Sequence, residues 1–150
     1  MRYAHICLLN VFMKIEYLNI KPNAENLSVL SSEPFRAIVV VEEPVSPEWR
    51  HNLSRSLVKA GCLYMMAWGI EASSWDDSVD HANLEAFSYG DIPKEKCVMT
   101  TWHDNEPLEA VFTYSKRLAH HPVLDLEKTV IVHIASTSKE SDYLSMYIDI

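Results

Sequence analysis

Four short apolar runs, rich in β-branched residues, constrain the fold of this chain more than any other feature. They cover residues 36–42, 62–68, 97–102 and 129–135. The first run contains Ala37–Val41 without polar alternation, which is typical of a strand buried on both faces of a sheet. Segments with helical periodicity separate the runs, so the sequence predicts an α/β fold built on a mostly parallel sheet.

The first helical segment has clear signals at both ends. Ser46 suits an N-cap and Pro47 suits the first helical position. Gly61 follows the last periodic residue, where a left-handed backbone favours glycine. We therefore expect a helix over residues 47–60.

Three further helices are predicted from capping patterns and periodicity. Ser74 precedes Trp75-Asp76-Asp77 in a capping-box pattern, and Gly90 ends that segment. A second helix is expected after Pro107, and a third after a capping box formed by Thr137 and Glu140. The alternation in DYLSMYIDI would also allow a strand in place of this third helix. The segments KIEYLNI and PNAENLSVL within residues 1–34 are the hardest to interpret, and we expect a strand and a short helical turn there.

These elements predict one domain over residues 1–150, with a three-layer α/β sandwich around four to five strands, Rossmann-like or flavodoxin-like. Right-handed crossovers would place helices on both faces of the sheet. Numbering the four apolar runs in chain order, we expect the strand order 2-1-3-4, as in flavodoxin-like sheets.

The glycine content excludes several nucleotide and nucleophile motifs. Only Gly61, Gly69 and Gly90 occur, too far apart for a G-x-G-x-x-G, a P-loop or a G-x-S-x-G motif. No H-E-x-x-H sequence and no metal-binding Cys/His spacing is present either. A nucleotide site is therefore disfavoured, and we expect no cofactor and no bound metal.

The charge distribution points to a basic partner. Thirteen Lys and Arg residues against 21 Asp and Glu residues give a net charge of −8. Residues 60–93 and 97–115 contain nine acids and no Lys or Arg. Because phosphate binding depends on basic side chains, we expect no nucleic acid as a partner.

The cysteines and the hydropathy indicate a cytoplasmic protein. Cys7, Cys62 and Cys97 are odd in number and form no C-x-x-C pair, so we expect free thiols in a reducing compartment. No apolar run approaches the roughly 20 residues that a membrane span needs, so no membrane is expected as a partner.

A site would lie at the carboxyl ends of the strands, where open α/β sheets bind ligands. With the order 2-1-3-4, Glu42, Glu43, His103 and Asp104 would flank one crevice. His103 and Asp104 with Glu42 are the catalytic candidates. The candidate binding residues near the same rim are Glu43, Trp68, Trp75, Asp76, Asp77, Trp102 and Glu106.

Ordinary structural roles compete with each assignment. Acids in the first turn of a helix, such as Asp76, Asp77 and Asp104, are stabilised by free backbone N–H groups. Trp68 and Trp102 at strand ends are more typical of a core than of a stacking surface. His133, inside the fourth run, is expected to be a hydrogen-bonded core histidine.

The leading hypothesis is a non-enzymatic protein that binds another, basic protein through this acidic, tryptophan-bearing rim. Interfaces are enriched in Trp, and charge complementarity speeds encounter. Immunity proteins that neutralise basic toxins, and regulatory proteins, share this character. The alternative is a metal-assisted hydrolase or small-ligand enzyme, in which carboxylates hold Mg²⁺ and His103 acts as acid or base.

Overall fold

The computed structural model describes residues 14–29, 31 and 33–150, and its centre is a parallel sheet. The sheet has five strands in the order β1-β5-β2-β3-β4, and every pair is parallel. The strands are β1 (Lys14–Ile20), β2 (Phe35–Val41), β3 (Cys62–Gly69), β4 (Met99–His103) and β5 (Lys128–Ile134). The predicted parallel sheet is therefore confirmed, and KIEYLNI is its fifth strand.

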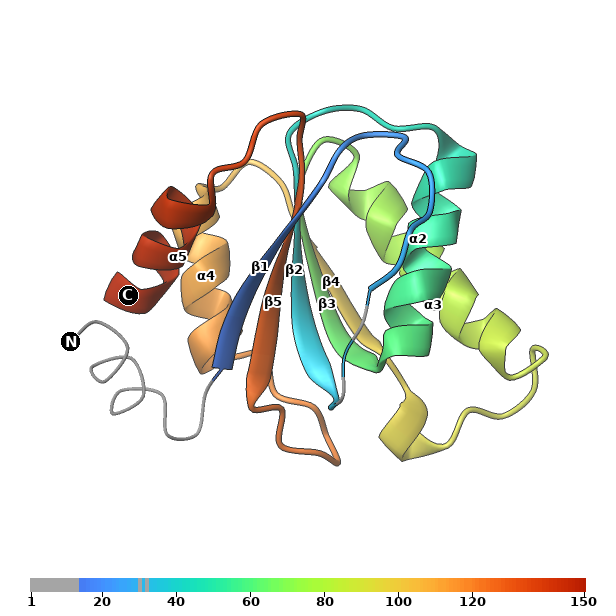
Figure 1. Cartoon of the computed structure of the whole chain (residues 1–150). Helices are drawn as coiled ribbons and strands as arrows, with labels where there is room; N and C mark the ends of the chain where they lie inside the picture. The colour runs from blue at the N-terminus through green and yellow to red at the C-terminus, as the bar shows by residue number, and fades with distance from the viewer. Residues whose placement is uncertain (1–13, 30, 32) are drawn as a thin grey trace.

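Helices cover both faces of the sheet and complete the expected three layers (Figure 1). The helices α2 (Pro47–Ala60) and α3 (Ala72–Ala86) lie on one face, and α4 (Leu108–Arg117) and α5 (Glu140–Asp149) lie on the other. A short 3-10 turn, η1 (Lys94–Lys96), precedes β4. The predicted helical turn after Pro22 is absent, because residues 22–29 form only turns, bends and irregular structure.

Strand β2 is the centre of the hydrophobic core. All seven of its residues are buried. Side chains of a strand alternate between faces, so Ala37, Val39 and Val41 pack under α2 and α3. Ile38 and Val40 pack on the opposite side with residues of α4 and α5. The continuous apolar run in the sequence follows directly from this burial on two faces.

Both ends of α2 lie where the sequence predicts them, whereas the start of α3 does not. Ser46 caps α2, its Oγ accepting from the backbone N–H of Trp49 at 3.2 Å, and Gly61 follows α2 in the left-handed conformation. Helix α3 begins two residues before Ser74, with Glu71 at the N-cap in a left-handed conformation. Thr137 and Glu140 form no capping box, since Lys139 is the N-cap of α5.

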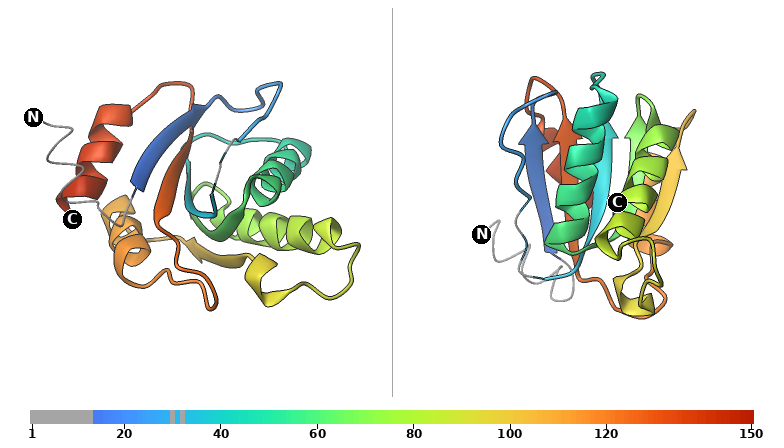
Figure 2. Two further views of the ribbon diagram at one scale, coloured as in Figure 1. Left: turned by 60° about the horizontal axis from the view of Figure 1, so that its bottom comes forward. Right: turned by 90° about the vertical axis from the view of Figure 1, so that its right-hand side faces the viewer.

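The strand order differs from the expected 2-1-3-4. Strand β2 lies between β5 and β3, and β4 lies at the sheet edge beyond β3 (Figure 2). The faces that the helices cover explain this order. Right-handed crossovers through α2 and α3, on one face, move the chain outward from β2 to β4. The next crossover, through α4 on the other face, reverses the direction and returns the chain to the far side of β2.

In the part of the chain that the structure describes, no helix is both long and apolar enough to cross a membrane. Cys62 is a buried free thiol and Cys97 a half-buried one, whereas Cys7 lies outside the described residues.

A substitution of Gly69 should destabilise the fold strongly. Gly69 has φ 101°, and an added Cβ would lie 2.2 Å from the carbonyl oxygen of Val41. That oxygen already accepts from the N–H of Ile70, so it is not free to move. We expect Gly69→Ala to lower the free energy of unfolding by at least about 3 kcal/mol, as measured by urea denaturation.

Gly61→Ala is the matched control, because Gly61 has φ 105° but a new Cβ there would make only ordinary van der Waals contacts, 3.7 Å from the carbonyl oxygen of Glu33. This variant should lower the free energy of unfolding by about 1 kcal/mol, through backbone strain alone. Equal losses for the two variants would contradict the close approach of β3 to β2.

Candidate functional site

A hydrogen-bonded cluster joins the carboxyl ends of β1, β2 and β5 to α5. At its centre is His133, which is completely buried. Its Nε2 lies 2.6 Å from Oε1 of Glu42, and its Nδ1 lies 2.6 Å from the hydroxyl of Tyr17. Tyr143 and Lys139 also donate to Glu42, the ammonium of Lys139 at 2.9 Å from Oε2. Five side chains from four elements therefore share one polar network.

The protons of this network can all be placed with a neutral imidazole. The Tyr17 oxygen accepts from the backbone N–H of Lys139 at 2.9 Å. Its own proton then goes to Nδ1 of His133, and the Nε2 proton of His133 goes to Glu42. The expected core histidine is therefore present with both ring nitrogens hydrogen-bonded.

Electrostatics keep Glu42 ionised within the cluster. Partial burial acts to raise the pKa of the Glu42 carboxyl, but hydrogen bonds from Tyr143, Lys139 and His133 outweigh it and lower that pKa. Burial, with the neighbouring Glu42 carboxylate, raises the pKa of the Tyr143 hydroxyl. Tyr143 therefore stays protonated and acts as a donor.

The predicted crevice does not form, because β3 separates β2 from β4. Glu42 therefore meets His133 of β5 and not His103 of β4. Glu43 accepts from the Ser136 backbone N–H at 2.5 Å and from the Ser136 hydroxyl at 2.8 Å. Asp104 lies exposed in the loop after β4. The prediction that Glu42, His103 and Asp104 lie together is therefore wrong.

His103 instead lies between a hydroxyl and a carboxylate at the end of β4. Its Nε2 is 2.9 Å from Oγ1 of Thr101, and its Nδ1 is 2.5 Å from Oε1 of Glu106. The ring packs edge-on against Tyr114 at 4.9 Å between centroids. A neighbouring hollow of about 290 Å³ is lined by His103, Glu106, Ala110, Thr113, Tyr114, Arg117 and Leu118.

The three predicted rim tryptophans have different environments. Trp68 is half-buried and donates from Nε1 to the Glu106 carbonyl at 2.7 Å. Trp102 is exposed, with 52% of its surface accessible. Trp75, which we expected at the rim, is fully buried and packs against Trp49. It faces the core because α3 starts at Ala72, which aligns Ala72, Trp75 and Val79 in the buried stripe.

The two aspartates that follow Trp75 also separate. Asp76 is buried, and burial raises the pKa of its carboxyl, with the charges of Asp80 and Asp77 adding to the effect. Asp77, the next residue along the helix, is exposed. Of this pair, only Asp77 remains available at the surface to a partner.

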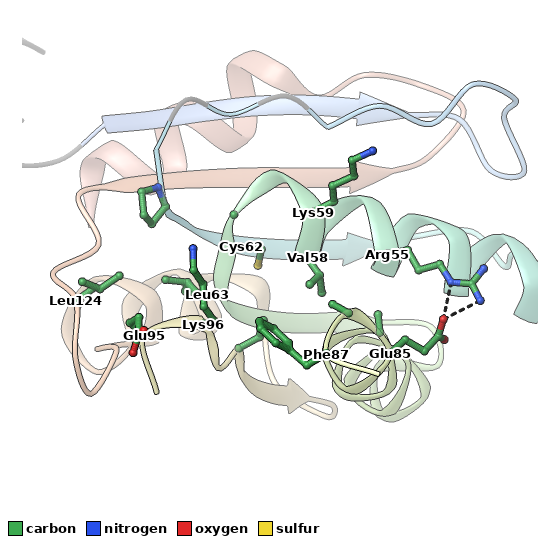
Figure 3. A pocket seen from close by; sticks show the side chains of 15 residues that line it. Arg55, Val58, Lys59, Cys62, Leu63, Glu85, Phe87, Glu95, Lys96 and Leu124 are labelled. Carbon is green, nitrogen blue, oxygen red and sulfur yellow. Dashed lines mark hydrogen bonds and ion pairs between the residues drawn. The ribbon is translucent and has the colours of Figure 1, made fainter. Parts of the chain in front are cut away.

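A large pocket lies at the amino ends of the strands, where the sequence indicated nothing. Figure 3 shows it between the last turns of α2 and α3, with a volume of about 570 Å³. Val58, Leu63, Phe87 and Leu124 give it an apolar lining, and the Arg55–Glu85 ion pair lies at one side. Burial raises the pKa of the Cys62 thiol in this wall to about 12, so that thiol is not a nucleophile.

Sequence reasoning missed the partners of Glu42, because Tyr17, His133 and Tyr143 come from segments far apart in the chain. One signal was available: a histidine two residues before the end of a buried strand needs polar partners, and the predicted parallel sheet places Glu42 at the same end.

Removal of the Glu42 charge should make the fold less stable and less sensitive to acid. Because the folded-state pKa of Glu42 lies below its ordinary value of 4.5, ionised Glu42 stabilises the fold above that pH. This stabilisation disappears as the pH falls through the lowered pKa. We expect Glu42→Gln to lower the free energy of unfolding by about 1–2 kcal/mol at pH 7 and by less at pH 3, as measured by urea denaturation.

Glu109→Gln, on the exposed face of α4, is the control and should change stability little at either pH. A Glu42→Gln variant as stable as the wild type at pH 7 would show that the network does not stabilise the fold.

Comparisons with known proteins give a family. The family model described as "Domain of unknown function (DUF7684)" matches residues 15–150. A solved structure described as "Crystal structure of an hypothetical protein" is similar with 11% sequence identity and a TM-score of 0.45, covering 84% of this chain and 75% of that chain. No curated protein matches the sequence. Because the family model covers nearly the whole chain, the chain belongs to the DUF7684 family.

Proposed function

We propose that this protein binds a basic, extended segment of a partner protein along the free edge of β4. The observation that carries the proposal is that Trp102 is exposed on an edge strand surrounded by acids. Among the described strands, β4 pairs only with β3. An unpaired edge offers backbone N–H and C=O groups to which another chain can add as a strand.

The side chains of β4 suit such an interface. Trp102 is 52% exposed and Met99 is 37% exposed. Large apolar side chains at the surface of a small protein are typical binding residues, and Trp is the residue most enriched among them. In Figure 2 the outer side of β4 forms one margin of the sheet.

The charges near β4 specify a basic occupant. Asp80 accepts from the hydroxyl of Thr100 on β4 at 2.7 Å, and both Asp80 and the neighbouring Asp77 are exposed. Asp104 and Glu106 follow the strand directly. Lys and Arg are absent from residues 60–93 and 97–115, so a basic segment meets a predominantly negative field here. Lys94 and Lys96 of η1, before β4, are the exceptions.

An immunity-like or regulatory role fits a small acidic protein with one such surface. We place this role in the cytoplasm, because the buried thiol of Cys62 and the half-buried thiol of Cys97 suit a reducing compartment.

The test is binding kinetics on a partner captured from the native host and identified by mass spectrometry. Trp102→Ala should raise the dissociation rate at least about tenfold, because it removes a buried anchor from the complex. Asp77→Asn combined with Asp104→Asn should lower the association rate, and this effect should fade in high salt. Glu25→Gln, an exposed acid in the loop after β1, is the control and should change neither rate.

Hydrogen exchange on the complex locates the contact. Protection of the amides of Met99–His103 supports the proposal. A captured partner that is itself acidic, protection confined to other strands, or unchanged rates for both variants would refute it.

A second candidate function, hydrolysis of an ester or amide, rests on Thr101, His103 and Glu106. A hydroxyl, an imidazole and a carboxylate in hydrogen-bonded sequence form the arrangement of a nucleophile, its base and the group that orients the base. The distances are 2.9 Å from Thr101 Oγ1 to His103 Nε2 and 2.5 Å from His103 Nδ1 to Glu106. This candidate ranks second because Thr101 is not among the residues that line the adjacent hollow.

The enzymatic candidate is tested with p-nitrophenyl acetate as the substrate. It predicts ester hydrolysis that His103→Asn and Thr101→Val each reduce at least about 100-fold, with His120→Asn as the control. Hydrolysis at the uncatalysed rate, or at the same rate in all variants, would exclude it for this ester.

A further inference from the structure

We propose that His51, His81 and Glu85 form a binding site for a Zn²⁺ ion between α2 and α3. One ligand atom of each residue lies within 4.8 Å of the other two. His81 and Glu85 are one turn apart on α3, and His51 comes from α2. None of these three ligands belongs to the β4 edge or to the Glu42 cluster.

The spacing of the donor atoms suits a tetrahedral ion. Ligands at about 2.0–2.1 Å from Zn²⁺ lie about 3.4 Å from one another. His81 Nε2 is 3.3 Å from Oε1 of Glu85, and the His51 and His81 rings are 5.2 Å apart between centroids. His51 Nε2 contacts the same Glu85 oxygen, so a small side-chain rotation admits the ion. Two imidazoles and one carboxylate favour Zn²⁺ over Mg²⁺ or Ca²⁺.

A chain of hydroxyl groups turns the lone pair of His51 toward this site. The Ser54 hydroxyl donates to the Arg50 carbonyl at 2.9 Å, which uses its only proton. Ser78 must therefore donate to Ser54, at 2.8 Å, and it is left with only lone pairs for Nδ1 of His51 at 3.5 Å.

This arrangement favours a proton on Nδ1 of His51, and the Nε2 of such a neutral ring directs an unshared pair at the Glu85 carboxylate. Two acceptors facing each other require a proton or a cation between them. A bound Zn²⁺ meets this requirement without a second proton on the imidazole. In most metal sites the second ring nitrogen of a ligating histidine is hydrogen-bonded, which fixes the tautomer and the orientation of the ring.

The surroundings orient the other two ligands and leave space for the ion. Arg55 donates to Oε2 of Glu85 at 3.0 Å, which fixes the carboxylate and leaves Oε1 directed at the histidines. The Tyr89 hydroxyl lies 3.3 Å from His81 Nε2, and in the tautomer in which it donates, that nitrogen has the lone pair that an ion needs. A shallow hollow bordered by His51, Asp77, Ser78 and His81 opens the site to solvent. Three protein ligands then leave a fourth position for water.

The test is calorimetric titration of the full chain with ZnCl₂ at pH 7.5. We expect one Zn²⁺ ion to bind per chain, and we expect this binding to require both His51 and His81. Titration with MgCl₂ should release no heat of binding. His51→Gln and His81→Gln should each weaken binding at least about tenfold, and Ser78→Ala should weaken it about tenfold through the orientation of His51. His120→Gln, an exposed histidine beyond α4, should bind as the wild type does.

NMR of the imidazole nitrogens provides an independent measurement. Zn²⁺ should shift Nε2 of His51 and His81 and leave that of His120 unchanged. Equal Zn²⁺ affinity in the wild type, His51→Gln and His81→Gln would overturn the proposal. An absence of Zn²⁺ binding to the wild type would overturn it as well, and a doubly protonated His51 ring would then show that a proton occupies the place assigned to the ion. Neither result would affect binding at the β4 edge.

Discussion

The position of β2 between β5 and β3 determines which side chains meet in this protein. Every residue of β2 is buried, so the strand can lie only in the centre of the sheet, with helices on both faces. Its pairing with β5 brings Glu42 to His133, and its pairing with β3 keeps Glu42 away from His103. The polar groups at the carboxyl end therefore form one internal network near β2 and a separate one at β4, not a shared crevice.

This division gives the two ends of the sheet different roles. Near β2 the hydrogen bonds of Glu42 are made to side chains of the protein itself, which makes that cluster a stabilising element. At the β4 side the sheet ends, the backbone is unpaired on one side, and Trp102 is exposed. The groups still available to another molecule thus gather at β4 and between α2 and α3, and both proposals concern these surfaces.

The sequence predicted the elements well because their signals are local. Apolar runs marked the strands, and Ser46, Pro47 and Gly61 marked both ends of α2. The strand order could not be obtained in this way, because any two buried parallel strands have equivalent patterns. The error over Trp75 also had a local cause: α3 starts three residues earlier than expected, so Trp75 lies within the helix on its buried stripe and not in a loop at the rim.

The candidate sites were less predictable because their residues meet only after folding. Of the predicted rim residues, Trp102, Asp77, Asp104 and Glu106 remain in the proposed interface, whereas Glu42 and Glu43 have internal partners. His51 lies 30 residues before His81 in the chain, and only the packing of α2 on α3 brings them together. The expectation of no metal rested on the absence of metal-binding motifs in the sequence and on the carboxyl-end rim, and neither reveals this helix pair.

Amide hydrogen exchange of the free protein, measured by NMR at Met99–His103, tests the central claim that β4 offers an open edge. Alternate amides of a parallel edge strand point toward β3 and away from the sheet. The account predicts slow exchange for the amides bonded to β3 and exchange near the rate of an unprotected chain for the outward ones. Uniformly slow exchange along β4 would show that the edge is already covered and would contradict the account.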